Sequence, residues 1–245
     1  MILELDCGNS LIKWRVLQVS GDVAAQGASV SAVDLLSALS GLTGVKIERA
    51  RLVSVRSDLE TEELCSCISS ALFIDVQRAL PAPRLGGVVN GYLEYDRLGM
   101  DRWLAMVGAF QLERRAMVVI DLGTAVTVDF VDAEGGHLGG YICPGISLLR
   151  QQLTTHTRRI SYTAEEIPMM QGEPAPGRST VQAVERGCFL MLRSFVASQV
   201  LAASDYLGAD FVIYSTGGDA TLIDDMVGVR RVPDLVFRGL AIACP

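Results

Sequence analysis

MILELDCGNSLIKW (residues 1–14) begins as an apolar run typical of a buried strand and then turns polar, with an acid, a glycine, an amide and a hydroxyl close together. Gly and Asn are common turn formers, so this stretch alone predicts a β-hairpin. The same pattern, an apolar strand followed by D-x-G-[NT] and a second, alternating strand, returns in AMVVIDLGTAVTVDFV (116–131). The two aspartates, Asp6 and Asp121, lie about half the chain apart. This repeat predicts two halves of similar topology.

Strand and helix patterns alternate along the rest of the chain and predict an α/β protein with mixed sheets. The expected strands are 1–5, 12–19, 51–55, 116–120, 125–131, 137–145 and 211–215, and the expected helices are 31–40, 60–71, 101–113, 179–204 and 219–227. Two stretches rich in Pro and Gly, 81–92 and 165–179, are expected to be loops. We expect an N-terminal domain over 1–115 and a C-terminal domain over 116–245.

The composition excludes several classes of function. The formal net charge of −7 over 245 residues argues against a nucleic-acid binder, although backbone N–H groups and a metal can still hold an anionic ligand. The six cysteines form no C-x-x-C pair, which argues against zinc, and we interpret them as reduced core thiols. With only two histidines, a Ser-His-Asp or Cys-His catalytic centre is not expected.

The sequence also bears on the cellular location. The first six residues contain two acids and lack a basic region, so no signal peptide is expected. The longest uncharged run, 135–149, has 15 residues, which is too short to span a membrane. We therefore expect a cytoplasmic protein without a membrane partner.

Three glycine-containing turns together suggest a nucleotide site. A bound triphosphate needs donors for its phosphate oxygens, carboxylates that hold Mg²⁺ through water, and glycines that let the backbone approach. Asp6 and Asp121 are the candidate carboxylates, and STGGD (215–219), with Gly217 and Gly218, is a candidate surface for adenosine. The candidate phosphate ligands are Gly8, Asn9, Ser10, Lys13, Gly123 and Thr124. The chain has no P-loop and no G-x-G-x-x-G after a strand, so the site would be of a two-hairpin type.

This combination resembles the actin-like ATPase superfamily and, within it, the type III pantothenate kinases. The motifs that carry the resemblance are D-C-G-N-S-L-I-K-W (6–14), D-L-G-T-A-V-T-V-D (121–129), G-M-D-R-W (99–103), G-G-Y-I-x-P-G-I (139–146), T-G-G-D (216–219) and P-D-L-V-x-x-G-L (233–240). They extend over essentially the whole chain. Ser10 stands where the family often has Thr, which keeps the hydroxyl. The resemblance implies two similar domains of ribonuclease-H-like topology with a nucleotide cleft between them.

The resemblance also implies roles for the substrate residues. Asp101, which by pattern alone would cap the helix that follows, would be the general base, and Gly99 belongs to the same signature. Arg102 offers a planar fork suited to the carboxylate of pantothenate, and Tyr92 would line the same pocket or simply pack half-buried.

Thr180, at the start of the helix 179–204, begins a segment with two interpretations. Ser179 and Gln182 form a capping-box pattern that explains the hydroxyls structurally, whereas the resemblance places Thr180 in the pantothenate pocket of a partner subunit. The helix is apolar nearly all round, which agrees with either a homodimer interface or a core position.

The resulting hypothesis is ATP-dependent phosphorylation of pantothenate, with Mg²⁺ held through water by Asp6. The resemblance further implies a monovalent cation, K⁺ or NH₄⁺, near Asp121. Three alternatives stay open at this point: another small-metabolite kinase of the superfamily, a nucleotide-binding regulatory protein, and a filament-forming ATPase, for which the chain is short.

Overall fold

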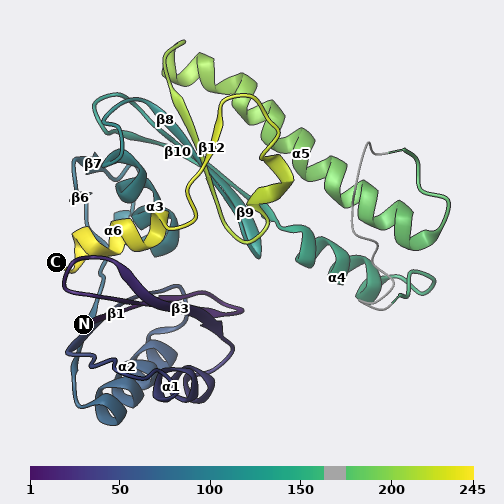
Figure 1. The fold of residues 1–245 in the computed structure, drawn as a ribbon. Coiled ribbons are helices and arrows are strands. Elements are labelled where there is room, and N and C mark those ends of the chain that lie inside the picture. The colour runs from purple at the N-terminus through teal and green to yellow at the C-terminus, as the bar shows by residue number, and fades with distance from the viewer. Residues whose placement is uncertain (163–174) are drawn as a thin grey trace. The chain divides into compact units, whose positions relative to one another are not determined.

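The structure, a computed structural model, describes residues 1–162 and 175–245 (Figure 1). The chain forms two compact units. The first unit comprises 1–114, 134–137 and 234–245, and the second comprises 115–133 and 138–233. These units differ from the expected domains because two later segments, one of them the end of the chain, return to the first unit.

The first unit is built on a five-stranded mixed sheet in the order β3-β2-β1-β4-β5. Its strands are β1 (Ile2–Cys7), β2 (Ile12–Leu17), β3 (Val23–Ser29), β4 (Arg49–Ser54) and β5 (Asp75–Arg78). β1, β2 and β3 pair antiparallel, whereas β4 pairs parallel with both β1 and β5. A small hairpin of β6 (Arg84–Leu85) and β7 (Val88–Val89) follows.

Helices cover both faces of this sheet. They are α1 (Ala32–Ser40), α2 (Asp58–Leu72), α3 (Met100–Phe110) and α6 (Leu235–Ala243), with a short 3₁₀ turn η1 (Tyr95–Arg97). Alternate residues of β1, among them Leu3 and Leu5, pack with α1 and α2 in one core, and α6 contacts β1 and β4 (Figure 1). Because side chains alternate along a strand, Glu4 and Asp6 lie on the face opposite Leu3 and Leu5.

The second unit repeats the sheet order of the first, as the internal repeat predicts. Its sheet runs β10-β9-β8-β11-β12, with β8 (Met117–Leu122), β9 (Ala125–Val131), β10 (His137–Pro144), β11 (Val212–Thr216) and β12 (Val229–Arg231). β8 corresponds to β1: it pairs antiparallel with the next strand and parallel with a later one. The two D-x-G-[NT] motifs therefore occupy equivalent hairpins.

The described part of the second unit also contains two helices and a 3₁₀ turn, namely α4 (Ile146–His156), α5 (Thr180–Leu207) and η3 (Ala220–Ile223). One face of α5, including Val184, Leu192 and Val196, is buried in the core against β8 and β9. Other apolar residues of α5 stay exposed, namely Leu190, Met191, Leu201 and Tyr206. A core position therefore accounts for the buried face of α5 but not for its exposed apolar residues.

Some expectations from the sequence were wrong. The expected helix 219–227 is only the four-residue 3₁₀ turn η3 followed by turns. The elements β3, β5, β12, α4 and α6 were not expected. Of the expected loop 165–179, residues 165–174 lie outside the described residues.

The expectation for the cysteines needs correction in part. All six are free thiols, but only Cys7, Cys188 and Cys244 are buried, whereas the other three are half-buried.

α5 is longer than any uncharged run of the sequence, because it includes a few charged residues. By length and apolar composition this one helix of the described chain is able to cross a membrane, with 22% of its most apolar window buried. The core helix of a soluble protein passes the same test. Glu185 of α5 is fully buried and pairs with Arg150 of α4. The first turns of α5 are therefore packed within the second unit.

Candidate active site

The first hairpin turn is a tight four-residue connection between β1 and β2. The Gly8 N–H donates to the Leu11 carbonyl at 3.0 Å, which closes the turn. Asn9 and Ser10 are exposed at its tip, and Asp6 stands opposite Lys13 in the antiparallel ladder. The turn thus presents an amide, a hydroxyl, a carboxylate and an ammonium group from one short segment.

The carboxyl of Asp6 has a raised pKa. Burial raises the pKa of its carboxyl from 3.8 to about 6, Lys13 opposes this rise, and the nearby Asp101 adds to it. Two carboxylates that influence each other in this way favour a cation between or beside them. Among the described residues no group of three or more His, Cys, Asp or Glu side chains forms a metal cage. This donor set fits Mg²⁺ that arrives with phosphate and keeps most of its waters.

Arg56 contacts the first hairpin turn and was not among the site residues predicted from the sequence. It follows β4, the strand beside β1, and its Nε donates to the Gly8 carbonyl at 2.9 Å. Its guanidinium group therefore lies against the first hairpin turn and adds a second positive charge to that of Lys13. A basic residue just after the strand that neighbours β1 was the available signal, because parallel strands end at the same edge of a sheet.

The G-x-D-R motif forms the start of α3. Gly99 is the N-cap residue and makes no side-chain capping bond, so Asp101 is not the N-cap residue. The Asp101 Oδ1 instead accepts from the Arg102 N–H at 2.8 Å. A Cβ atom at Gly99 would lie 2.8 Å from this same oxygen, so the glycine leaves room for the carboxylate. Asp101 therefore has a fixed position in the first turn of α3.

Arg102 is buried, with 5% exposure, and contacts Tyr92. Its Nη1 donates to the Tyr92 hydroxyl at 2.7 Å, and its guanidinium carbon lies 5.5 Å from the centre of the Tyr92 ring. The interpretation of Tyr92 as half-buried holds, and it lines a cavity of about 400 Å³ together with Gly91, Leu93, Glu94 and Arg97. An arginine and a tyrosine joined beside a cavity suit an acid group.

The second hairpin turn receives the start of a helix. Gly123 and Thr124 connect β8 and β9, and the Gly145 N–H donates to the Thr124 carbonyl at 2.9 Å. A Cβ atom at Gly145 would lie only 2.2 Å from the Gly123 carbonyl oxygen, so no larger residue fits there. Gly145 is the N-cap of α4, whose first N–H groups therefore lie beside this turn. A helix N-terminus at a turn of this type favours phosphate.

The third glycine turn lies at the same edge of the second sheet. Thr216 pairs with Asp121, and Gly217 follows with φ of +97°, a conformation that favours glycine. A Cβ atom at Gly217 would lie 2.5 Å from Asp121 Oδ1 and 2.4 Å from the Leu122 carbonyl oxygen. Gly218 is exposed, with no atom within 4 Å of a Cβ built on it. The carboxylate and the carbonyl suit a hard cation, and the open glycine suits a flat ligand.

Thr180 is exposed at the start of α5 in the second unit. Ser179 is the N-cap and accepts from the Gln182 N–H at 3.3 Å. The Gln182 side chain accepts from the Arg178 N–H rather than from Ser179, so only half of the expected capping box forms.

The predicted site residues fall into two groups, one in each unit. The first unit holds Asp6, Gly8, Asn9, Ser10, Lys13, Tyr92, Gly99, Asp101 and Arg102, and the second unit holds Asp121, Gly123, Thr124, Thr180, Gly217 and Gly218.

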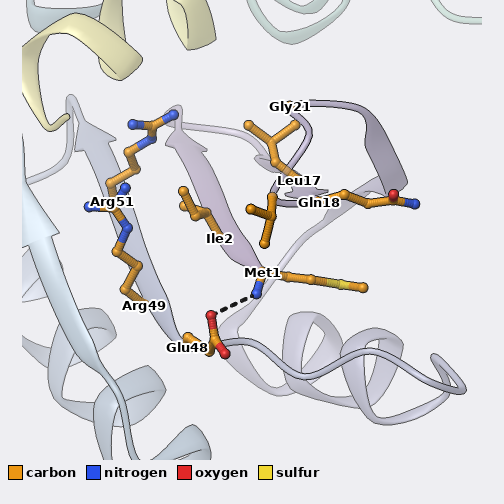
Figure 2. A pocket seen from close by; sticks show the side chains of 9 residues that line it. Met1, Ile2, Leu17, Gln18, Gly21, Glu48, Arg49 and Arg51 are labelled. Carbon is orange, nitrogen blue, oxygen red and sulfur yellow. Dashed lines mark hydrogen bonds and ion pairs between the residues drawn. The ribbon is translucent and has the colours of Figure 1, made fainter.

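A second cavity of the first unit, of about 430 Å³, contains none of the predicted residues (Figure 2). It lies at the Ile2 end of β1, away from the first hairpin turn, and beside it the N-terminal ammonium pairs with Glu48 at 3.2 Å. Arg51, which also lines it, donates from Nε to the buried Glu4 at 2.8 Å and from Nη1 to the Cys244 carbonyl at 2.6 Å. Through these two hydrogen bonds Arg51 links the C-terminal segment to the sheet.

The chain is similar along its full length to proteins of one family. A family model described as type III pantothenate kinase matches residues 2–202. Type III pantothenate kinases from Ectopseudomonas mendocina and Pseudomonas syringae pv. syringae are 55% and 56% identical over 247 residues, and each match covers 100% of this chain and 99% of the relative.

Solved structures show the same fold at low sequence identity. Acetate kinase from Porphyromonas gingivalis aligns with a TM-score of 0.51 at 14% identity and covers 98% of both chains. A Campylobacter jejuni protein assigned to the Baf family of transcriptional activators aligns with a TM-score of 0.59 at 19% identity, over 98% of this chain and 96% of that one.

Proposed function

The chain belongs to the type III pantothenate kinase family, and on that premise we propose that it phosphorylates pantothenate with ATP to give 4′-phosphopantothenate, the first step of coenzyme A biosynthesis. The observation that carries the proposal is the coupling of Asp6 to Asp101. The first belongs to the phosphate motif and the second to the substrate motif, and each lies within the electrostatic reach of the other. An enzyme that transfers phosphate to a hydroxyl needs these two functions side by side.

Each of the two repeated hairpins is proposed to bind phosphate groups of ATP. The exposed Asn9 and Ser10 and the mobile ammonium of Lys13 serve phosphate oxygens from the first unit. Thr124, Gly123 and the α4 N-terminus beside them do so from the second. Gly217 and Gly218 take the adenosine. Charge stabilisation and positioning of this kind supply most of the catalysis in phosphoryl transfer.

Asp6 is the residue that would hold Mg²⁺, through bound water, and the ion supplies charge neutralisation at the phosphates when it is bound. Its buried carboxylate is costly in the free protein, which favours binding of a cation to its ionised form. Asp121 would hold the monovalent cation, K⁺ or NH₄⁺, because its carboxylate and the Leu122 carbonyl approach the same point at Gly217.

Asp101 is proposed as the general base. It accepts the proton of the primary hydroxyl of pantothenate as that oxygen forms a bond to the γ-phosphorus and the bond between this phosphorus and the β–γ bridging oxygen breaks. ADP leaves with the electron pair, and the proton passes from Asp101 to solvent. Arg102 and the Tyr92 hydroxyl hold the carboxylate at the opposite end of the substrate, so that the hydroxyl meets the base in one orientation.

The protein is proposed to act as a homodimer in the cytoplasm, where ATP is available. The exposed apolar residues of α5, Leu190, Met191, Leu201 and Tyr206, are the candidate interface. Thr180 at the start of the same helix would then reach the pantothenate pocket of the partner subunit.

A steady-state assay with ATP, Mg²⁺ and pantothenate tests the function, with ADP and phosphopantothenate both measured. We expect turnover in the presence of K⁺ and much less with Na⁺. A panel of sugars and acetate as acceptors distinguishes other kinases of the superfamily. A regulatory protein would bind ATP without producing ADP, and absence of turnover with K⁺ and pantothenate would overturn the proposal.

A further inference from the structure

His137 is a buried residue of the first unit that packs against the proposed substrate pocket. It is 4% exposed and is the first residue of β10. Its imidazole stacks on the ring of Tyr92, with 5.9 Å between ring centres and 14° between ring planes. None of the sequence motifs that indicate the nucleotide or substrate site includes His137.

The backbone of His137 also supports the loop that carries Tyr92. A Cβ atom at Gly91 would lie 1.7 Å from the His137 carbonyl oxygen, so only glycine allows the loop to lie this close. Asn90 completes the loop: its Oδ1 accepts from the Tyr92 N–H and its Nδ2 donates to the Tyr95 carbonyl, both at 3.0 Å. The loop is thus held by hydrogen bonds within it and by His137 beneath it.

The orientation of Tyr92 determines what Arg102 meets. The Tyr92 hydroxyl accepts from Arg102 Nη1 at 2.7 Å, and the guanidinium group lies over the same ring that His137 stacks on. A tyrosine free to rotate would lose this hydrogen bond and leave the buried guanidinium partly unsatisfied, which is costly. A flat ring packed parallel to Tyr92 restricts that rotation.

We propose that His137 is a positioning residue for the acid end of the substrate, acting through Tyr92 on Arg102. The inference rests on the proposed function, because pantothenate supplies the carboxylate. Its role is stacking, so an aromatic ring of similar size replaces it and a side chain without a ring does not.

The test compares His137→Phe, which keeps the ring, with His137→Gln and His137→Ala, which remove it. For the two variants without a ring we expect KM for pantothenate to rise about 3- to 10-fold, the effect of losing an aromatic pair. KM for ATP and kcat should stay near the wild-type values, and His137→Phe should restore KM for pantothenate. Equal KM values for the Phe and Gln variants would overturn the role of the ring.

Two controls separate positioning from general loss of stability. Leu39→Ala removes a buried side chain of α1 in the same unit, and it should lower the melting temperature without changing KM for pantothenate. In a Tyr92→Ala background, His137→Ala should add no further change in KM, whereas an additive change would show that His137 acts by another route.

The same assays separate the two proposals from each other. If the wild-type protein does not phosphorylate pantothenate, the proposed function fails. If it does, and His137→Ala and His137→Gln keep the wild-type KM for pantothenate, only the positioning role fails. Should His137→Ala not fold, the Phe and Gln pair still gives the decision.

Discussion

Asp6 and Lys13 face each other across the first hairpin, yet the carboxyl of Asp6 keeps a pKa of about 6. Burial outweighs the attraction of the ammonium group, and Asp101 adds to the rise. The protein therefore holds an acid whose ionised form is unfavourable. Such tension between stability and function is common at catalytic sites.

Asp6→Asn is expected to stabilise the ligand-free protein at about pH 7.5, by on the order of 2 kcal/mol. Folding raises the pKa of the Asp6 carboxyl from 3.8 to about 6. The contribution of Asp6 to the stability of the folded protein is therefore complete below pH 3.8, and it is lost as the pH rises through about 6. Thermal unfolding at about pH 7.5 and about pH 4.5 measures this, and the advantage of the variant should shrink at the lower pH. An advantage of equal size at both pH values would contradict the prediction.

Asp101→Asn should keep the fold and lose about 10²- to 10⁴-fold in kcat, the usual contribution of a general base. The amide retains an oxygen that can accept from the Arg102 N–H, so the start of α3 should be unchanged. Steady-state kinetics and far-UV circular dichroism provide the two measurements. Activity close to that of the wild type would remove Asp101 as the base.

Arg56→Ala should raise KM for ATP about 10-fold, because the hydrogen bond that Arg56 donates to the first hairpin turn is lost. Arg49→Ala is the matched control. Arg49 also donates to a backbone carbonyl, that of Pro245, at 2.6 Å, but it lies at the opposite end of β4. Kinetics with varied ATP should separate the two variants, and equal KM values would show that Arg56 has no role at the turn.

Glu4→Gln should lower the free energy of unfolding by about 3–5 kcal/mol, since it leaves the buried Arg51 without its counter-charge, whereas the half-buried Arg15 keeps its ion pair with Asp234. Glu4 is fully buried and pairs with both Arg15 and Arg51. Glu48→Gln removes an exposed ion pair with the N-terminal ammonium and should cost less than about 1 kcal/mol. Urea unfolding of both variants measures the difference, and similar costs would mean that burial of the pair is unimportant.

Leu201→Glu should convert a dimer into a monomer, because it places a charge among the exposed apolar residues of α5. Leu59→Glu, at an exposed position of α2 in the other unit, is the control and should leave the dimer intact. Light scattering after size-exclusion chromatography gives the mass. A wild-type protein that elutes as a monomer at all concentrations would refute the interface.

The elements that could be predicted from the sequence are those in which the spacing of apolar residues shows which face is buried. Both hairpins with D-x-G-[NT] turns formed, since alternating apolar residues set which face of each strand is buried. The edge strand β3 was missed because it is largely exposed and contains Gly27, which is held by close packing against Trp14. The helix expected at 219–227 shortened to η3, whose Ala220 and Ile223 are buried while the residues after it turn away.

Those parts of the candidate site that lie within one short segment of the sequence could be predicted. The turns at Gly8 and Gly123 and the G-x-D-R segment are contiguous in the sequence. The contacts of Arg56 with Gly8 and of His137 with Tyr92 join residues more than forty positions apart, and only the folded chain brings them together. α4 was not predicted because its residues are mostly polar or half-buried, although its N-cap Gly145 belongs to the motif G-G-Y-I-x-P-G-I (139–146).

The return of α6 to the first unit sets an order for synthesis. Residues 234–245 pack against α3, and a Cβ atom at Gly239 would lie 2.0 Å from the Leu104 carbonyl, so the two helices touch backbone to backbone. A ribosome delivers these residues after every strand of the two sheets. The first unit is therefore completed only after the strands of the second unit have been made, and a nonsense codon just before residue 234 would damage the unit whose synthesis began first.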